Sequence, residues 1–157
     1  MPSNLYSQVN DSAILADPPP KLLSEYGFFV NTKDQITVPG VLPYELITSL
    51  FSDYADKHRF VYVPKGKIAA YQKNSVFSFP VGSVLIKTFS YEPINNQRSE
   101  RHLIETRLLI RKDSGWNALT YVWDEEGQEA SLALAGKTVK ANYISNDGRE
   151  LDIRYRV

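Results

Sequence analysis

From Arg59 onward, apolar and polar residues alternate in short runs that end in turn-forming residues. The first runs are RFVYVP, KIAAYQ, VFSFP, VGSVLIKTFSY and HLIETRLLIRK, and the turn sequences DSGW, DEEGQEA, LAGK and SNDGRE divide the remainder. Alternation with a period of two puts one side of a strand inward and the other in water. Such runs, with a turn signal about every 8–12 residues, are typical of β-sandwiches and barrels. The sequence therefore predicts an all-β domain, folded as an antiparallel β-sandwich or barrel.

The end of the chain carries the clearest predicted hairpin. Asn146-Asp147-Gly148 is a strong turn sequence for two antiparallel strands. After the turn, apolar residues at positions 151, 153, 155 and 157 alternate with charged residues at 152, 154 and 156. We expect this last strand to have one apolar side and one solvated side.

The N-terminal segment does not follow the strand pattern. Residues 1–20 are mainly polar and end in Pro18-Pro19-Pro20. A proline run favours an extended course, so we expect residues 1–20 to form an arm or linker ahead of a single β-rich domain over 21–157. We expect four apolar residues to pack against that domain and hold residues 1–20 to it: Leu22, Leu23, Phe28 and Phe29.

Residues 43–60, PYELITSLFSDYADKHRF, are the one segment with helical spacing. Pro43 suits the first turn of a helix. Apolar or aromatic residues then recur at spacings of three and four, at Leu46, Leu50 or Phe51, Tyr54 and His58. The sequence predicts one short helix here, with two short turns as the alternative because Ser49, Ser52 and Asp53 interrupt the pattern.

The charge balance and the absence of cysteine exclude several classes of function. Lys and Arg number 18 and Asp and Glu number 18 among 157 residues, so the net charge is zero. This balance predicts no general attraction to nucleic acid or to an anionic membrane. The absence of cysteine excludes disulfides and thiolate chemistry. No stretch approaches the ~18 apolar residues of a membrane span, and the N-terminus lacks the pattern of a signal peptide.

Two predicted strands place charged residues on the same side as large apolar ones. The shared sides hold Leu85, Lys87, Phe89 and Tyr91 in one strand and Leu103, Glu105, Arg107 and Leu109 in the other. Charges beside apolar groups are costly to bury unless they are paired. We therefore expect Lys87, Glu105 and Arg107 to neutralise one another between strands, with Asp53 or Arg59 as a further partner. The alternative is that these sides are solvated and that the core is formed by Ile104, Leu108 and Ile110.

Aromatic residues give a second candidate surface. Trp116, Tyr121 and Trp123 lie close together in GWNALTYVWDEE, and such side chains suit sugar stacking or a protein interface, although core packing is the commoner role. The two histidines, His58 and His102, fall in no metal-binding spacing, and no P-loop, G-x-S-x-G or G-x-G-x-x-G sequence is present. No catalytic or metal-ligating residue is assigned. The candidate ligand-binding residues are Trp116, Tyr121, Trp123, Lys87, Glu105, Arg107, Arg59 and His58.

Six segments in order resemble a family of bacterial diheme c-type cytochromes. They are LLSEYGFF, PYELITSLFSDYADKHRFVYVPKG, FSFPVGSVLIKTFSY, LIETRLLIR, GWNALTYVWD and IRYRV, and they span about Leu22 to Val157. In that family this region precedes the haem-bearing segment, which attaches haem c through Cys-x-x-Cys-His. Because the chain has no cysteine, the resemblance implies an N-terminal domain without haem of its own.

The resemblance implies a location and a partner. Haem is attached to c-type cytochromes outside the cytoplasm, so a periplasmic or extracellular protein is expected, with electron transfer confined to the haem segment. The expected role is an accessory domain that binds a ligand, such as a carbohydrate, or docks the cognate haem domain or a redox protein. The alternatives are a carbohydrate-active β-sandwich lyase or hydrolase and a purely structural cover for the haem module. For this chain alone the residues favour a binding role over catalysis.

Overall fold

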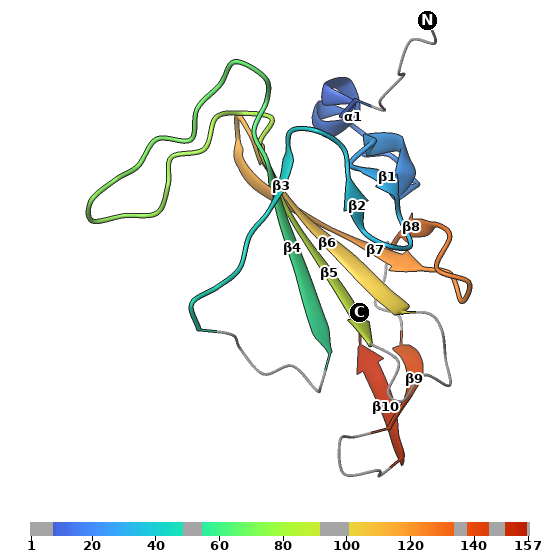
Figure 1. Cartoon of the computed structure of the whole chain (residues 1–157). Helices are drawn as coiled ribbons and strands as arrows, with labels where there is room; N and C mark the ends of the chain where they lie inside the picture. The colour runs from blue at the N-terminus through green and yellow to red at the C-terminus, as the bar shows by residue number, and fades with distance from the viewer. Residues whose placement is uncertain (1–7, 49–54, 92–100, 134–137, 145–149, 157) are drawn as a thin grey trace, which may run out of the picture.

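The chain folds as an all-β, sandwich-like domain of antiparallel sheets, which confirms the predicted fold class. The computed structural model describes residues 8–48, 55–91, 101–133, 138–144 and 150–156. A six-stranded sheet runs in chain order through β3 (Val41–Pro43), β4 (Asp56–Tyr62), β5 (Val84–Tyr91), β6 (His102–Lys112), β7 (Gly115–Trp123) and β8 (Ala130–Leu132). Each strand pairs antiparallel with the next, and the sheet twists along its length (Figure 1).

Two further strand pairs complete the β structure. β1 (Phe29–Asn31) pairs with β2 (Ile36–Thr37), and β9 (Thr138–Ile144) pairs with β10 (Glu150–Arg156). The hairpin predicted at the end of the chain is therefore present as β9 and β10, while its turn sequence at 146–148 lies outside the described residues. Arg154 and Arg156 are exposed, as expected for the solvated side of the last strand.

The sheet has two sides, which differ in what covers them. On the inner side, alternate residues of β4 to β7 are buried, among them Phe60, Ile86, Leu108 and Tyr121. The N-terminal segment forms the layer over this side, with α1 (Asp11–Leu15), η1 (Leu23–Tyr26), β1 and β2 (Figure 1). The core of the domain lies between the two layers.

The N-terminal layer belongs to the core. Ile14 of α1 is 1% exposed and packs in the same cluster as the inner side of the sheet. The helix starts where the Asn10 side chain accepts a hydrogen bond from the Ala13 backbone N–H, which satisfies one free donor of the first turn. Of the four residues expected to clip this segment to the domain, Leu23, Phe28 and Phe29 are buried, whereas Leu22 stays exposed.

The helix predicted over 43–60 is wrong where the structure describes that segment. Pro43 ends β3, residues 44–48 have no helical structure, and His58 lies within β4. Leu46 is half exposed and Ile47 is fully exposed, so a helical apolar stripe here would have no core to cover. The predicted helix positions Leu50, Phe51 and Tyr54 lie outside the described residues. The one α-helix among the described residues is α1.

Residues 64–80, hereafter the arm, also differ from the prediction. The runs KIAAYQ and VFSFP, predicted as strands, meet in a single β-bridge between Ala70 and Ser78. The arm leaves the end of β4 and returns to the start of β5, and it projects away from the rest of the domain (Figure 1). No strand of the described sheet lies beside the arm. Its residues favour the strand conformation, but they have no neighbouring strand with which to form backbone hydrogen bonds.

Candidate functional site

The outer side of the sheet places three cations in one row. Register partners run from Arg59 of β4 to Lys87 of β5 and on to Arg107 of β6. Residues directly opposite on neighbouring strands carry their side chains on the same side of a sheet. The central strands of the sheet therefore bring Arg59, Lys87 and Arg107, hereafter the cationic row, onto one surface.

Glu105 gives the cationic row its anionic partner. The Glu105 side chain is fully buried, and its Oε1 accepts a bond of 2.6 Å from Nη2 of Arg107, whose side chain is 48% exposed. Glu105 therefore pairs with Arg107 two positions along the same strand, β6, and not between strands as expected. Lys87 and Arg59 are not neutralised in the same way: within the described ranges, no carboxylate lies at salt-bridge distance from either. Asp53, the other expected partner, falls outside those ranges.

The ring of Phe89 supports two members of the row. Nζ of Lys87 lies 4.5 Å from the ring centroid, and the guanidinium carbon of Arg107 lies 5.0 Å from it. A cation over an aromatic face is attracted by the ring quadrupole. Phe89 is buried, so its ring has a fixed position in the sheet. The ring therefore fixes the positions of both cationic side chains, and because it is uncharged it does not neutralise them.

The environment of Lys87 disfavours its protonated form. Partial burial lowers the pKa of Lys87 first, and repulsion from Arg59, Arg107 and Lys57 lowers it further, while Glu105 acts in the opposite direction. Among the residues that the structure describes, the charges acting on Lys87 are the three cations and the buried carboxylate of Glu105, so positive charge predominates there. Such a group of cations is stabilised by any anion that binds among them.

An apolar row borders the cationic row. The register partners two residues away on the same three strands are Val61, Leu85 and Leu109, and they lie on the same side of the sheet. Val61 and Leu85 are partly exposed and Leu109 is 41% exposed. The outer surface therefore offers adjacent apolar and cationic strips, whereas the side chains that line the inner side are mostly buried.

A β-bulge changes the expected pattern of β6. Phe89 pairs with Glu105, but the next residue, Ser90, pairs with Leu103, so Ile104 is the extra residue. The bulge turns Leu103 to the inner side, where it joins the core cluster. The expectation that Leu103 shares a side with Glu105 is therefore wrong. Leu108 and Ile110 are core residues as the alternative interpretation had them, and Ile104 is buried outside that cluster.

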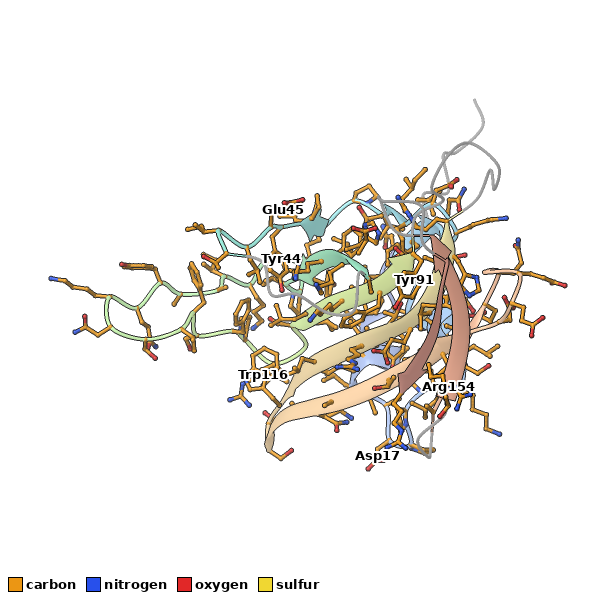
Figure 2. All side chains as sticks on the ribbon, turned by 90° about the horizontal axis from the view of Figure 1, so that it is seen from below. Asp17, Tyr44, Glu45, Tyr91, Trp116 and Arg154 are labelled. Carbon is orange, nitrogen blue, oxygen red and sulfur yellow. The ribbon has the colours of Figure 1, made fainter. Side chains whose placement is uncertain are left out.

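The aromatic candidates do not form one surface. Tyr121 is fully buried, and its hydroxyl donates to the Pro20 carbonyl at 2.8 Å and lies 2.9 Å from the Tyr26 hydroxyl. Trp123 is 5% exposed, and its indole N–H donates to Oγ1 of Thr106. Trp116 is 43% exposed at the start of β7, at the base of the arm (Figure 2). Tyr121 and Trp123 serve the core, and only Trp116 is available to a ligand.

His58 lies on the inner side, away from the cationic row. Its Nε2 is 2.9 Å from the Ser90 hydroxyl, and its register partner Thr88 bonds Thr106 at 2.7 Å. These contacts pair polar side chains of the sheet with one another and give His58 a structural role in the described part of the chain. Within those residues, no three His, Asp or Glu side chains are grouped to hold a metal ion.

Sequence reasoning missed the aromatic residues of the arm. Tyr71, Phe77, Phe79 and Trp116 form a chain of ring contacts with centroid distances of 6.0, 6.2 and 5.7 Å. A signal was present in the sequence, because the arm is rich in aromatic residues and contains lysines but no acidic residue. The alternating pattern of the arm predicts two ordinary strands instead.

Comparison with known proteins does not add a family to this picture. No family model matches the chain, and neither a curated protein nor a solved structure matches it significantly. In the described portion of the chain, no helix has the length and apolar character needed to cross a membrane.

Proposed function

We propose that this domain is an accessory docking or ligand-binding domain that holds an anionic group on the cationic row. The observation that supports it is the alignment of Arg59, Lys87 and Arg107 on three adjacent strands, with the carboxylate of Glu105 bonded to Arg107. A carboxylate, sulfate or phosphate placed over the row would relieve the repulsion that lowers the Lys87 pKa. The adjoining apolar row would cover the less polar part of the same partner.

In the biological setting that the sequence resemblance suggests, the domain accompanies an extracytoplasmic diheme c-type cytochrome and carries no haem itself. The anionic group then belongs to the haem-bearing module, to a redox partner or to an acidic carbohydrate. Docking surfaces between redox proteins use charge to orient the partners and to speed their association. The cationic row, with its apolar border, has the composition that this role requires.

Lys87→Met is expected to abolish anion binding while leaving the fold intact. Methionine retains most of the apolar stem but removes the central charge of the row. The probes are sulfate against chloride at equal ionic strength, and oligogalacturonate against uncharged maltohexaose. We expect sulfate and oligogalacturonate to raise the melting temperature of the wild type, and Lys87→Met to lose at least the oligogalacturonate shift. Because sulfate stabilises proteins in general, its effect is judged by the difference between wild type and variant.

The matched control is Lys21→Met, which removes an exposed lysine outside the cationic row. It should keep the full response to both anions. Equal shifts in wild type and Lys87→Met would exclude anion binding at the row and leave the structural-cover role. Release of shortened sugar products from oligogalacturonate would instead assign the chain to the carbohydrate-active enzymes. The cytochrome setting is tested separately: a gene without a Cys-x-x-Cys-His segment beside this domain would contradict it.

Anion binding should also depend on pH through Lys87. Below its lowered pKa the row carries all three charges, and above that pKa it carries two, so affinity should fall as the pH rises through it. Without ligand the sign is opposite for stability. Between the lowered pKa and the ordinary lysine value of 10.5, the unfolded chain binds more protons than the folded one, so stability rises with pH. Urea unfolding at stepped pH should show this rise in the wild type and not in Lys87→Met.

A further inference from the structure

The arm exposes large apolar side chains to solvent. Ile68 is 83% exposed, Val76 82%, Tyr71 75% and Phe77 52%. Every residue from 65 to 78 is exposed except Ala69, which is partly exposed, so no side of the arm is covered by the rest of the described chain. Figure 2 shows the arm standing clear of the sheet with side chains on both of its sides. A contiguous exposed apolar surface of this kind marks an interaction site.

The base of the arm is fixed. A Cβ atom on Gly82 would lie 2.9 Å from Cγ of Pro64, so the two ends of the arm approach as closely as a glycine allows. Gly82 has a φ of +91°, a conformation that other residues adopt only with strain. Phe79 packs edge-on against Trp116 of β7 and holds the returning half of the arm to the sheet. The exposed side chains are thus presented at a distance from the domain.

Charge is distributed unevenly between the ends of the molecule. The arm contains Lys65, Lys67 and Lys73, and residues 63–81 contain no Asp or Glu. Exposed carboxylates gather at Glu125 and Glu126, in the turn between β7 and β8, which lies at the other end of the sheet from the arm (Figure 1). Within the described residues, the arm is therefore cationic and apolar, whereas the β7–β8 turn is acidic. Such a separation turns the arm toward any negatively charged surface.

We propose that the arm binds the surface of a lipid bilayer containing anionic lipids. Ile68, Val76 and the aromatic rings enter the headgroup region, and the three lysines contact lipid phosphates. This combination of apolar and basic side chains is the one that interfacial membrane segments use. It adds to the docking role of the cationic row a second surface that positions the domain at a membrane.

Backbone hydrogen bonding limits the depth of insertion. Only the reciprocal pair between Ala70 and Ser78, both 2.9 Å, joins the two sides of the arm. Peptide groups without partners are costly in hydrocarbon but are readily hydrated among headgroups. The arm therefore rests at the interface and does not cross the bilayer. A second copy of the arm is a less suitable partner, because pairing two arms would bring six lysines together.

The first experiment measures co-sedimentation of the full chain with vesicles. Vesicles of phosphatidylcholine alone are compared with vesicles containing about 30 mol% phosphatidylglycerol, whose negative surface attracts lysines. We expect binding to the anionic vesicles only, weakened by salt. Ile68→Ser combined with Val76→Ser should weaken it about tenfold or more, because the apolar area that inserts is lost. Lys73→Gln should weaken it about fivefold, through the loss of one lysine near the surface.

Matched controls use the same substitutions elsewhere. Ile36→Ser combined with Val30→Ser changes two apolar residues of the β1–β2 hairpin that are 54% and 59% exposed. Lys21→Gln removes an exposed lysine distant from the arm in sequence. Both controls should bind like the wild type, and so should Lys87→Met, because the cationic row is a separate surface. Unchanged melting temperatures would show that all the variants are folded.

The second experiment places a reporter on the arm. Since the chain has no cysteine, Asn74→Cys provides a single labelling site on the exposed tip, and Glu125→Cys provides one in the acidic β7–β8 turn. A polarity-sensitive fluorophore should shift to the blue with anionic vesicles at position 74 and not at position 125. Equal or absent binding to both vesicle types would overturn the proposal. Concentration-dependent oligomers that disappear in the Ile68→Ser, Val76→Ser variant, without vesicle binding, would assign the arm to self-association instead.

Discussion

Phe28→Ala is expected to lower the free energy of unfolding by about 3–5 kcal/mol, the range typical of a phenylalanine removed from a core. Phe28 is 1% exposed, stacks on Tyr26 with a centroid distance of 5.2 Å and meets Tyr62 of β4 at 6.5 Å. Its removal would open a cavity between the N-terminal layer and the sheet. Small domains are stable by only about 5–15 kcal/mol, so the loss is a large part of the total. Urea unfolding followed by circular dichroism measures it.

Phe77→Ala is the matched control for this prediction. It makes the same change on the arm, where the ring is 52% exposed and contacts Tyr71 and Phe79. We expect a change of about 1 kcal/mol or less, since little area is buried there. Equal effects of the two substitutions would contradict the assignment of residues 11–38 to the core. They would indicate instead that the β-sheet is stable without the N-terminal layer.

Glu105→Ala is expected to destabilise the fold by about 1.5–3 kcal/mol through the lost charged hydrogen bond, because the Arg107 side chain left behind is 48% exposed and can be solvated. The carboxylate is fully buried and bonds Arg107 at 2.6 Å. Without it, Arg59, Lys87 and Arg107 would lie together with no negative charge from β6 beside them. Cavity formation at the buried position adds to the loss. The shift of the urea unfolding midpoint measures this loss, provided that the slope of the free energy of unfolding against urea concentration does not change.

Two further variants separate charge from space at this position. Glu105→Gln keeps the volume and removes the charge, so a loss close to that of alanine would identify the ion pair as the cause. Glu126→Ala removes an exposed carboxylate of the β7–β8 turn and should change stability by about 0.5 kcal/mol or less. A Glu105→Ala variant as stable as Glu126→Ala would show that Glu105 does not hold the cationic row together.

The candidate site was accessible from the sequence because its residues lie in regular strands. Lys87 and Arg107 stand on the same side as large apolar residues in two strongly alternating runs, and that conflict with simple burial singled them out. Arg59, Lys87 and Arg107 lie directly opposite one another because of the register of three strands. Register depends on contacts between residues that are distant in the chain, so the row itself required the structure.

For the aromatic residues, in contrast, closeness in the sequence was misleading. Trp116 and Trp123 belong to one strand, yet one is at the exposed base of the arm and the other is in the core. Their odd separation of seven positions places them on opposite sides of the strand, which sequence proximity concealed. Likewise Leu103 was assigned to the wrong side, because the bulge beside it shifts the alternation by one residue.

The sequence by itself determined the fold class and the central strands β5, β6 and β7, since period-two alternation between turn residues is a local property. It also determined which charged side chains would need partners. The tertiary structure alone decided which layer covers the sheet, that residues 56–62 extend in place of a helix, and that the arm remains uncovered. These outcomes depend on where apolar side chains find a surface to pack against, and that surface is built by segments far apart in the chain.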